Sequence, residues 1–254
     1  MTPRRAARRR SRGSTPSLTQ RVRLLVNERN LGDYPNRSRA ASLARGTYIK
    51  YVDSDDLIYP HGLQVMLDCM RRFPEAALGL SRPPDPVEPF PMCLDPAHAY
   101  ARHFFGGGLF SDGPLSAIIR RDCFEKVGCF SGKRYVGDTE LWLTLARHFG
   151  VVLMPLGLTW WRRHDGQEYA LGHRTLSYAA QGFEILQAAL KHADCPLTQD
   201  QRQLALRAVK TGHALELLVL ARRVSVRQAL EIAQTSRLGL ADVWRALMRR
   251  LSLA

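Results

Sequence analysis

The chain has 254 residues, a formal net charge of +14 at pH 7 and a hydrophobic fraction of 45%. This length suits one domain, or one domain with an appendage, and the hydrophobic fraction is enough for a buried core. The sequence contains no apolar run long enough to cross a bilayer, so we expect no membrane-spanning helix. Its five cysteines are odd in number and lack C-x-x-C spacing, which indicates reduced thiols rather than a zinc site or a disulfide framework.

Residues 1–20 form a basic segment of Arg, Ser, Pro and Gly without apolar periodicity. We expect this segment to be a disordered tail. No apolar stretch follows its arginines, which argues against a secretory signal. A basic segment of this kind can bind nucleic acid or anionic lipid by electrostatic attraction alone. A basic binding module is therefore one function that we consider.

The next elements predict one βαβ crossover. The run Arg21–Val26 alternates and then turns apolar, which suits a strand. Residues Asn36–Ala44 offer one apolar helix face that ends before Gly46, and residues 46–52 suit a second strand. In such a unit the two strands are parallel, and the loops that follow them lie at one edge of the sheet.

Downstream of Pro60, apolar residues at positions 63, 66, 67 and 70 predict a helix that faces the core. The Pro-rich stretch Leu78–Ala101 is expected to be irregular, either a functional loop or a mobile excursion. Short strands are expected at 115–119 and 151–155, and helices at 121–127 and from Gly137. Three helical segments are then expected at 173–192, 198–223 and 226–253. The last is amphipathic and basic, so it either packs on the main domain or lies on a membrane surface.

Three carboxylates follow the strand at 46–52 within four residues, in Asp53-Ser54-Asp55-Asp56. Ligands of open α/β sheets bind outside the carboxyl ends of the strands. Close carboxylates repel one another unless a cation neutralises them, and Mg²⁺ prefers oxygen ligands of this kind. A solvated acidic turn explains a lone D-x-D as well, because Asp is a common turn residue. The surrounding sequence has to decide between the two interpretations.

The sequence around this turn resembles the family 2 glycosyltransferases of GT-A fold. That family has an R-x-x-x-N-x-x-N-x-G stretch, a further asparagine, and then A-x-G-x-Y-I-x-x-x-D-x-D-D followed by a proline. The matching residues of this chain are Arg23, Asn27, Asn30, Gly32, Asn36, Ala44, Gly46, Tyr48, Ile49, Asp53, Asp55, Asp56 and Pro60.

Two later stretches are similar to the same family. Gly137-Asp138-Thr139-Glu140-Leu141-Trp142 looks like its E-D-x-x-L-W box, with Gly137 in place of the first acid. Trp161-Arg162-Arg163-His164 resembles its Y-R-x-H sequence. The family's first strand–helix–strand unit, which holds the nucleobase, does not precede Arg21 in this sequence.

The resemblance implies an α/β fold. We expect a GT-A-like (Rossmann-like) mixed sheet flanked by helices, incomplete at its N-terminus because the first βαβ unit is missing, with a C-terminal α-helical extension. The expected divisions are a disordered basic tail at 1–20, the glycosyltransferase-like domain at 21–170 and the helical extension at 171–254.

The resemblance also implies roles for individual residues. Asp138 is the expected general base, although an acid in the first turn of a helix also stabilises the helix dipole. Asp53, Asp55 and His164 are expected to hold Mg²⁺ or Mn²⁺, and the alternative for His164 is an ordinary structural histidine. The expected donor-binding residues are Arg23, Asn27, Asn30, Asn36 and Asp53.

The implied activity is an inverting, metal-dependent transfer of a sugar from a nucleotide-sugar donor to a hydroxyl of a saccharide or lipid-linked acceptor, in surface polysaccharide or glycoconjugate synthesis. The alternatives are a catalytically impaired remnant of such an enzyme and a basic module that binds nucleic acid or membranes. No specific nucleic acid is expected as a partner. We expect a cytoplasmic protein, with peripheral contact at the inner membrane through the basic C-terminal helix.

Overall fold

The computed structural model describes residues 22–83, 85–164, 167, 169, 172, 177–223 and 225–251, so the expected tail at 1–20 lies outside the described residues. The chain divides into two compact units, Met1–Gly32 and Asp33–Ala254. The described residues of the first unit, 22–32, contain no helix or strand. The strand expected at Arg21–Val26 is therefore wrong for its described part. Its apolar side chains lack a buried face, since Leu24 and Val26 are exposed.

The second unit is built on a five-stranded sheet with the order β1-β5-β3-β6-β4. Neighbouring strands run antiparallel, except that β3 and β6 are parallel. The expectation of a mixed sheet is therefore confirmed. The expected parallel crossover around residues 36–52 is wrong, because the partner of β1 is the antiparallel β5. The strands are β1 (Tyr48–Ile49), β3 (Ala76–Ser81), β4 (Met92–Leu94), β5 (Ala117–Arg120) and β6 (Gly150–Met154).

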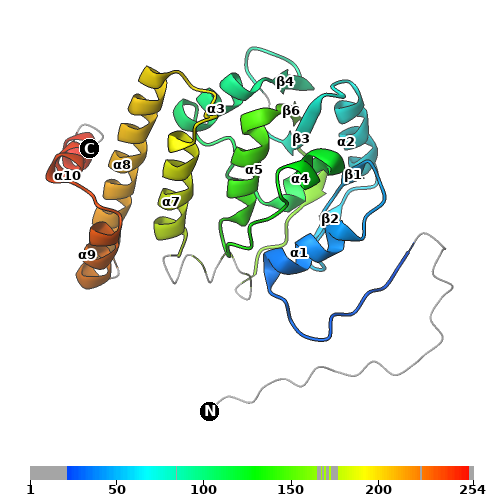
Figure 1. Ribbon diagram of the computed structural model, residues 1–254, viewed down its shortest axis with the longest axis horizontal. Helices are drawn as coiled ribbons and strands as arrows, with labels where there is room; N and C mark the ends of the chain where they lie inside the picture. Colours follow the sequence, from blue (N-terminus) through cyan, green and yellow to red (C-terminus); the bar gives the residue numbers. More distant parts are fainter. Residues whose placement is uncertain are drawn as a thin grey trace. The chain divides into compact units, whose positions relative to one another are not determined.

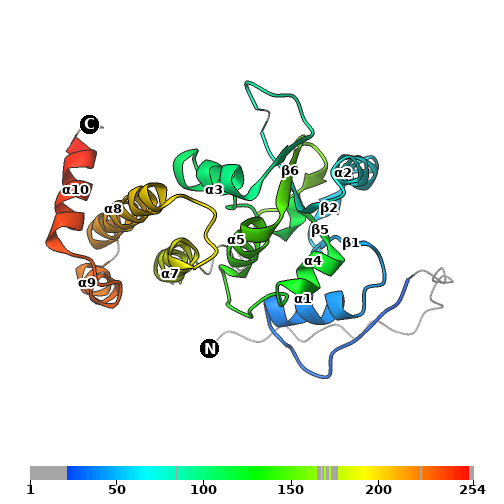
Figure 2. The same cartoon turned by 45° about the horizontal axis from the view of Figure 1, so that its top comes forward.

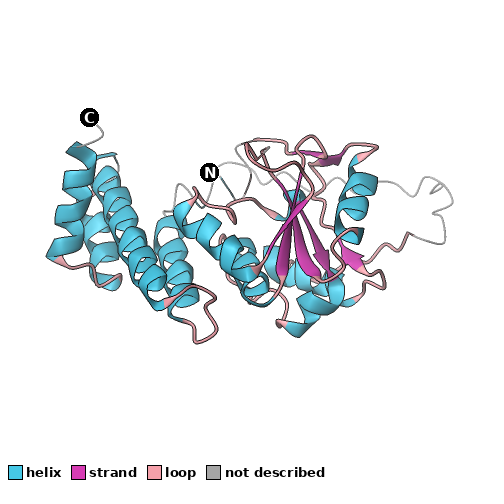
Figure 3. Cartoon of the chain, turned by 90° about the horizontal axis from the view of Figure 1, so that it is seen from above, coloured by secondary structure: helices cyan, strands magenta, loops and turns pink. Residues whose placement is uncertain are grey.

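Helices cover both faces of this sheet, which Figure 3 shows in magenta between cyan helices. Side chains of β6 alternate between two apolar clusters, as the period of a strand requires. Val152 and Met154 belong to the cluster beneath α2 (Gly62–Arg71), whereas Val151 and Leu153 belong to the cluster on the opposite face. That opposite face is covered by α3 (Pro96–Phe105) and α5 (Gly137–His148).

One glycine in the sheet permits the close packing of α2. A Cβ at Gly79 would lie 2.4 Å from Met154 Cε, 2.7 Å from Met70 Sδ and 2.8 Å from Ile118 Cγ2. These distances are shorter than ordinary contacts, so a side chain at this point would push the helix away from β3. The small residue therefore sets how closely the helix approaches the sheet.

The irregular loop expected at Leu78–Ala101 is wrong for most of its length. It contains most of β3, β4 and the start of α3, joined by an irregular connection. All six residues of β3 are buried, so the strand has no polar alternation that would reveal it. The start of α3 does carry a local signal, because the Asp95 side chain caps the helix by accepting a hydrogen bond from His98 N and Pro96 follows directly.

The remaining helices lie close to those predicted from the sequence. The shorter ones are α1 (Asp33–Ser42) and α4 (Arg121–Lys126), and the C-terminal part consists of α7 (Ser177–Lys191), α8 (Gln199–Arg223), α9 (Val226–Thr235) and α10 (Leu240–Leu251). The single segment expected at 226–253 is therefore two helices, separated by a turn in which Arg237 has a φ of 50°. Figure 1 shows α7 beside α5 and α8 beside α7. The domain boundaries at 170 and 171 remain predictions.

The apolar core of the sheet continues into the C-terminal helices. Leu190 of α7 and Ala205 of α8 belong to the same buried cluster as the residues of β3 and α5. No helix among the described residues has both the length and the hydropathy needed to span a bilayer.

Candidate functional site

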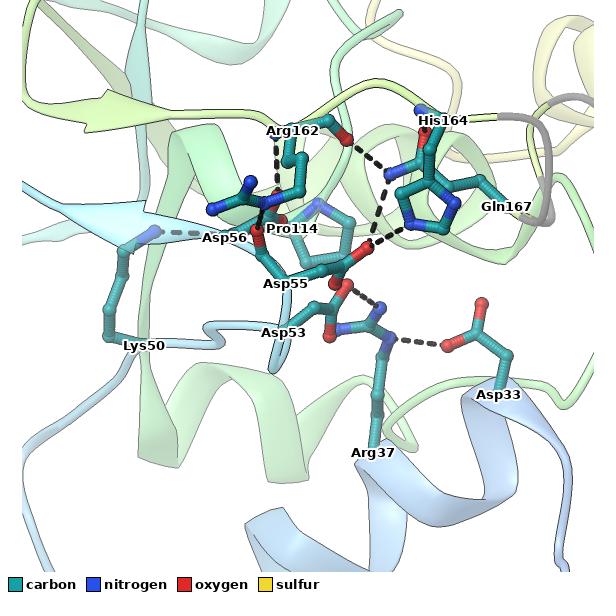
Figure 4. Close-up of polar contacts among 10 residues, drawn as sticks. All are labelled: Asp33, Arg37, Lys50, Asp53, Asp55, Asp56, Pro114, Arg162, His164 and Gln167. Carbon is teal, nitrogen blue, oxygen red and sulfur yellow. Dashed lines mark hydrogen bonds and ion pairs between the residues drawn. The ribbon is translucent and has the colours of Figure 1, made fainter. Parts of the chain in front are cut away.

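The acidic turn lies directly after β1, at the carboxyl end of that strand. The amide of Asp56 donates to the carbonyl of Asp53 at 3.0 Å and closes the turn. The chain continues into β2 (Leu57–Ile58), which pairs antiparallel with β7 (Thr159–Trp160). This pairing places the segment after β7 next to the acidic turn, as Figure 4 shows for Arg162 and His164.

Asp55 is held between two residues that are more than 100 positions away in the chain. Its Oδ2 lies 2.9 Å from Nε2 of His164 and accepts a hydrogen bond from Nε2 of Gln167 at 3.3 Å. The hydrogen bond with His164 is the main cause that lowers the pKa of Asp55 below its ordinary value. Gln167 also accepts from the amide of His164, so it supports both partners. Sequence reasoning missed Gln167, whose only signal is its place three residues after the expected histidine.

Asp56 has a different environment from Asp55. Its side chain is buried, and Oδ1 accepts a hydrogen bond from the amide of Arg162 at 3.0 Å. Arg162 in turn donates from Nε to the carbonyl of Asp55 at 2.9 Å. Burial raises the pKa of Asp56. These contacts fasten the acidic turn to the segment after β7, and they orient Asp55 toward His164.

Asp53 is paired with a cation from α1. Arg37 donates from Nη2 to Asp53 Oδ2 at 2.7 Å and from Nε to Asp33 Oδ1 at 2.6 Å. The hydroxyl of Tyr51 donates to the carbonyl of Arg37 at 3.1 Å. Burial alone would lower the pKa of Arg37, but the two carboxylates outweigh it and raise the pKa. Sequence reasoning missed Arg37, although its i,i+4 spacing from Asp33 is a recognisable helical pair.

Asp138 lies in the first turn of α5, beside α1 and the loop before β5. Its Oδ1 accepts a hydrogen bond from the amide of Thr139 at 2.7 Å, and a Cβ at Gly113 would lie 3.6 Å from its Oδ2. Burial raises the pKa of Asp138 to about 6, while hydrogen bonds from Thr139 and from the Tyr34 hydroxyl act against this rise. A carboxyl with this pKa is ionised at neutral pH and is a stronger base than an exposed aspartate.

Tyr34 explains why the box at 137–138 begins with glycine. Its ring is buried against the start of α5, and a Cβ at Gly137 would lie 2.8 Å from Tyr34 Cδ2. The ring also packs on Phe130, with 4.9 Å between the ring centroids. An acidic side chain at position 137 would collide with this ring. Tyr34 thus occupies the space that the missing acid would need.

The helix α1 connects the two acidic regions. Tyr34 and Arg37 are three residues apart and so lie on the same side of the helix. The first contacts the start of α5, and the second pairs with Asp53. Charge from Asp33 contributes to the raised pKa of Asp138, although burial is the larger cause. Asp53 and Asp138 therefore flank one helix.

Lys50 joins the strand before the acidic turn to the loop beside Asp138. Its ammonium group donates to the carbonyls of Pro114, at 3.4 Å, and Leu115. Burial lowers the pKa of Lys50 to about 7, and the nearby carboxylates of Asp56 and Asp53 partly counteract this effect. Lys50 also lines a cavity of about 700 Å³ between β1 and α2. That cavity contains none of the acids described above, so we place the candidate site at the acidic turn.

The other expected donor-binding residues lie on two parts of the chain. Arg23, Asn27 and Asn30 belong to the first unit, where the Asn30 side chain accepts a hydrogen bond from the amide of Gly32 at 2.8 Å. Asn36 lies on α1 with an exposed side chain. Their roles in donor binding stay predictions.

The side chains at the acidic turn suit a divalent cation that also binds substrate phosphates. They do not suit a metal site made of protein ligands alone. No group of three or more His, Cys, Asp or Glu side chains among the described residues is placed to hold a metal ion. Mg²⁺ commonly uses only one or two protein carboxylates and takes its other ligands from water and substrate phosphates. Asp55 and His164 offer a carboxylate and an imidazole side by side. Asp53 is partly neutralised by Arg37, so it is a weaker ligand.

The chain is similar to known proteins in sequence and in fold. Glycosyl transferase family 2 matches residues 10–128, a segment that contains the acidic turn and ends before Asp138 and His164. An uncharacterized glycosyltransferase of Methanocaldococcus jannaschii is 42% identical over 45 residues, which cover 18% of this chain and 16% of that protein.

The crystal structure of S. aureus TarS residues 1–349 in complex with UDP-GlcNAc matches with a TM-score of 0.57 and 13% identity, over 81% of this chain and 61% of that chain. The chain thus spans less than two thirds of the length of either protein. The structural likeness confirms the expected GT-A-like fold with its C-terminal helices. The family match agrees with the expected class of protein, a transferase. Residues 10–128, somewhat less than half of this chain, are similar to glycosyl transferase family 2.

Proposed function

We propose that this protein transfers a sugar from a nucleoside diphosphate sugar to an acceptor hydroxyl, with inversion at the anomeric carbon. The observation that carries the proposal is the pair of acidic regions on either side of α1. One presents Asp55 beside His164, and the other presents a half-buried Asp138 with a raised pKa. UDP-GlcNAc is bound in the TarS structure of similar fold, so we propose a UDP-sugar as the donor.

The acidic turn would bind the diphosphate end of the donor. Asp55 and His164 would hold Mg²⁺ or Mn²⁺, which supplies Lewis-acid stabilisation of the negative charge that develops on a departing diphosphate. Asp53, kept in place by Arg37, would contact the ribose or the cation. Asp56 would keep the turn closed through its bond to the Arg162 amide. Donor contacts of Arg23, Asn27, Asn30 and Asn36 are part of this proposal.

Asp138 would act as the general base. With a pKa of about 6, its carboxylate is ionised at neutral pH and can accept the proton of the acceptor hydroxyl as that oxygen attacks the anomeric carbon. The bond from the sugar to the diphosphate oxygen breaks as the new glycosidic bond forms. A single displacement of this kind inverts the configuration. The Thr139 amide holds the carboxylate in one orientation.

We propose a saccharide or lipid-linked acceptor, in surface polysaccharide or glycoconjugate synthesis. This setting follows from the family alone. A position at the inner face of a membrane would suit a lipid-linked acceptor.

Calorimetric titration with UDP and UDP-sugars, with and without Mn²⁺, tests the proposed donor site. We expect binding that depends on Mn²⁺ in the unchanged protein and is lost in Asp55→Ala. Asp68→Ala is the matched control, because Asp68 is an exposed acid of α2 that also has a polar partner, Arg71. Binding that is equal in all three proteins would contradict the proposal. Binding without turnover would support the alternative of an impaired remnant.

A further inference from the structure

The last helix presents its apolar side chains away from the protein. Leu240, Trp244, Leu247 and Met248 follow one another at i, i+4, i+7 and i+8, so they lie on one face of α10. All four are exposed, with Leu240 at 91% and Trp244 at 63%. Such a face is normally buried against the core of a soluble domain.

The face of α10 that packs on the rest of the molecule is instead small and polar. Asp242 and Ala246 are its buried residues, with exposed fractions of 5% and 0%. Asp242 accepts a hydrogen bond from the amide of Gly239 at 3.0 Å and pairs with Arg245. At 100° per residue, this buried face is roughly opposite to the stripe from Leu240 to Met248. Figure 2 shows α10 on the far side of α8 from the sheet.

Arginines lie before α10 and along it, outside the apolar stripe. At 100° per residue, Arg245 borders the stripe at about 60° from Met248, and Arg249 lies on the opposite side of the helix. Arg237 precedes α10, and Arg245 and Arg249 lie along it, whereas Asp242 is the only acid of the helix. Asp242 and Arg245 offset each other's charge, but four arginines at 237, 245, 249 and 250 outnumber this one acid, so the formal charge of the region is positive. Trp side chains favour the boundary between lipid and water, and basic side chains beside an apolar face are attracted to anionic headgroups.

We propose that α10 docks this protein on an anionic lipid surface, with Leu240, Trp244, Leu247 and Met248 inserted at the level of the headgroups. A second copy of the chain fits this face less well, because two such helices would bring their arginines together. The helix would lie in the plane of the surface, since it is too short and too polar to cross a bilayer. This inference does not depend on the proposed transfer reaction.

Flotation of the full chain with vesicles tests the proposal. The vesicles are either pure phosphatidylcholine or phosphatidylcholine with phosphatidylglycerol. We expect binding to the anionic vesicles that weakens as salt is raised, and a roughly tenfold or greater loss of affinity in the double variant Leu240→Ser/Trp244→Ser. The control is Leu204→Ser, which removes an exposed leucine of α8. Both positions are exposed, so the substitutions should leave the fold intact, and thermal unfolding checks this.

The arginine-rich segment at 1–20 is present in every variant, so its contribution to binding cancels in the comparison. Equal binding of the double variant and the unchanged protein would overturn the proposal. It would also be overturned if no vesicle bound and light scattering showed self-association that Leu240→Ser/Trp244→Ser abolished. That result would assign the face to a second copy.

Discussion

Asp55 and Asp138 are both aspartates at the edge of the same α/β unit, yet their surroundings shift their pKa values in opposite directions. Asp55 is paired with His164, which lowers its pKa. Asp138 is half-buried at the start of α5, and desolvation there raises its pKa to about 6. The first arrangement favours a permanent negative charge, and the second favours a group that exchanges a proton near neutral pH.

This difference shows that side chains of one helix, α1, contribute to two chemical environments. On α1, Tyr34 covers Asp138 and takes the space of a second acid, while Arg37 offsets the charge of Asp53. Proton transfer and diphosphate binding would then be assigned to separate carboxylates. Substitutions at these carboxylates and their neighbours test that assignment.

Asp138→Asn should lower the turnover number by about 10²–10⁴-fold, because an amide of the same shape cannot accept the proton. The dissociation constant of the donor should stay unchanged, because the substituted group lies outside the acidic turn. Steady-state kinetics and calorimetry measure the two quantities on the same preparation. A parallel loss of donor binding would show that the two carboxylates do not have separate tasks.

His164→Ala should weaken Mn²⁺-dependent binding of UDP by about 10- to 100-fold, since it removes a proposed ligand and the hydrogen-bond partner of Asp55. His98→Ala is the matched control, because His98 forms an exposed pair with Asp95 at 2.8 Å in α3. Calorimetry with UDP measures both variants. An equal effect of the two substitutions would remove His164 from the proposed site.

The raised pKa of Asp138 should appear in the pH dependence of both rate and stability. The turnover number should rise about tenfold per pH unit below pH 6 and level off above it. The folded protein retains a proton on Asp138 between about pH 4 and 6 that the unfolded chain has released. The free energy of unfolding should therefore fall as pH rises through this interval, by about 2 kcal/mol. Denaturant titrations at several pH values measure it.

The same titrations on Asp138→Asn provide the control. The variant lacks the titrating group, so its stability should not show this fall, and it should be more stable than the unchanged protein at neutral pH. Identical pH profiles for the two proteins would place the raised pKa on another group.

Gly137→Ala should lower the free energy of unfolding by about 1–3 kcal/mol, because the added methyl group meets the Tyr34 ring at 2.8 Å. Gly182→Ala is the control. That position is in α7 with open space around it, so the substitution should stabilise the protein by about 0.5–1 kcal/mol. Chemical denaturation compares the two. Stabilisation by both substitutions would mean that Tyr34 does not restrict position 137.

Lys50→Met should lower the turnover number by about tenfold or less, with little change in KM. It removes the hydrogen bonds that tie the strand of the acidic turn to Pro114 and Leu115, beside the loop that contacts Asp138. Arg71→Met is the control, since Arg71 lines the same cavity but pairs with the exposed Asp68. A larger effect of Arg71→Met would assign the role to the cavity rather than to Lys50.

Elements with a local signal were predicted well. The apolar periodicity of α2 and the acidic start of α5 led to helices close to the observed ones. The strand β3 was missed because all its side chains are buried, so its sequence has no polar alternation. The expected strand at 21–26 had suitable residues, but a strand also needs a partner, which a sequence pattern does not supply.

The chemical types at the candidate site can be read from the sequence: the carboxylates of the acidic turn, the aspartate that opens α5 and the histidine after β7. Their order and spacing sufficed for the resemblance to glycosyltransferases. Their environments depend on the tertiary structure. The pairing of β2 with β7 places His164 on Asp55, and burial sets the pKa of Asp138. Likewise, the sequence showed that α10 is amphipathic, but only its packing on α8 through Asp242 and Ala246 revealed that the apolar face is the free one. Proximity and desolvation depend on contacts between distant segments, and a linear pattern does not contain them.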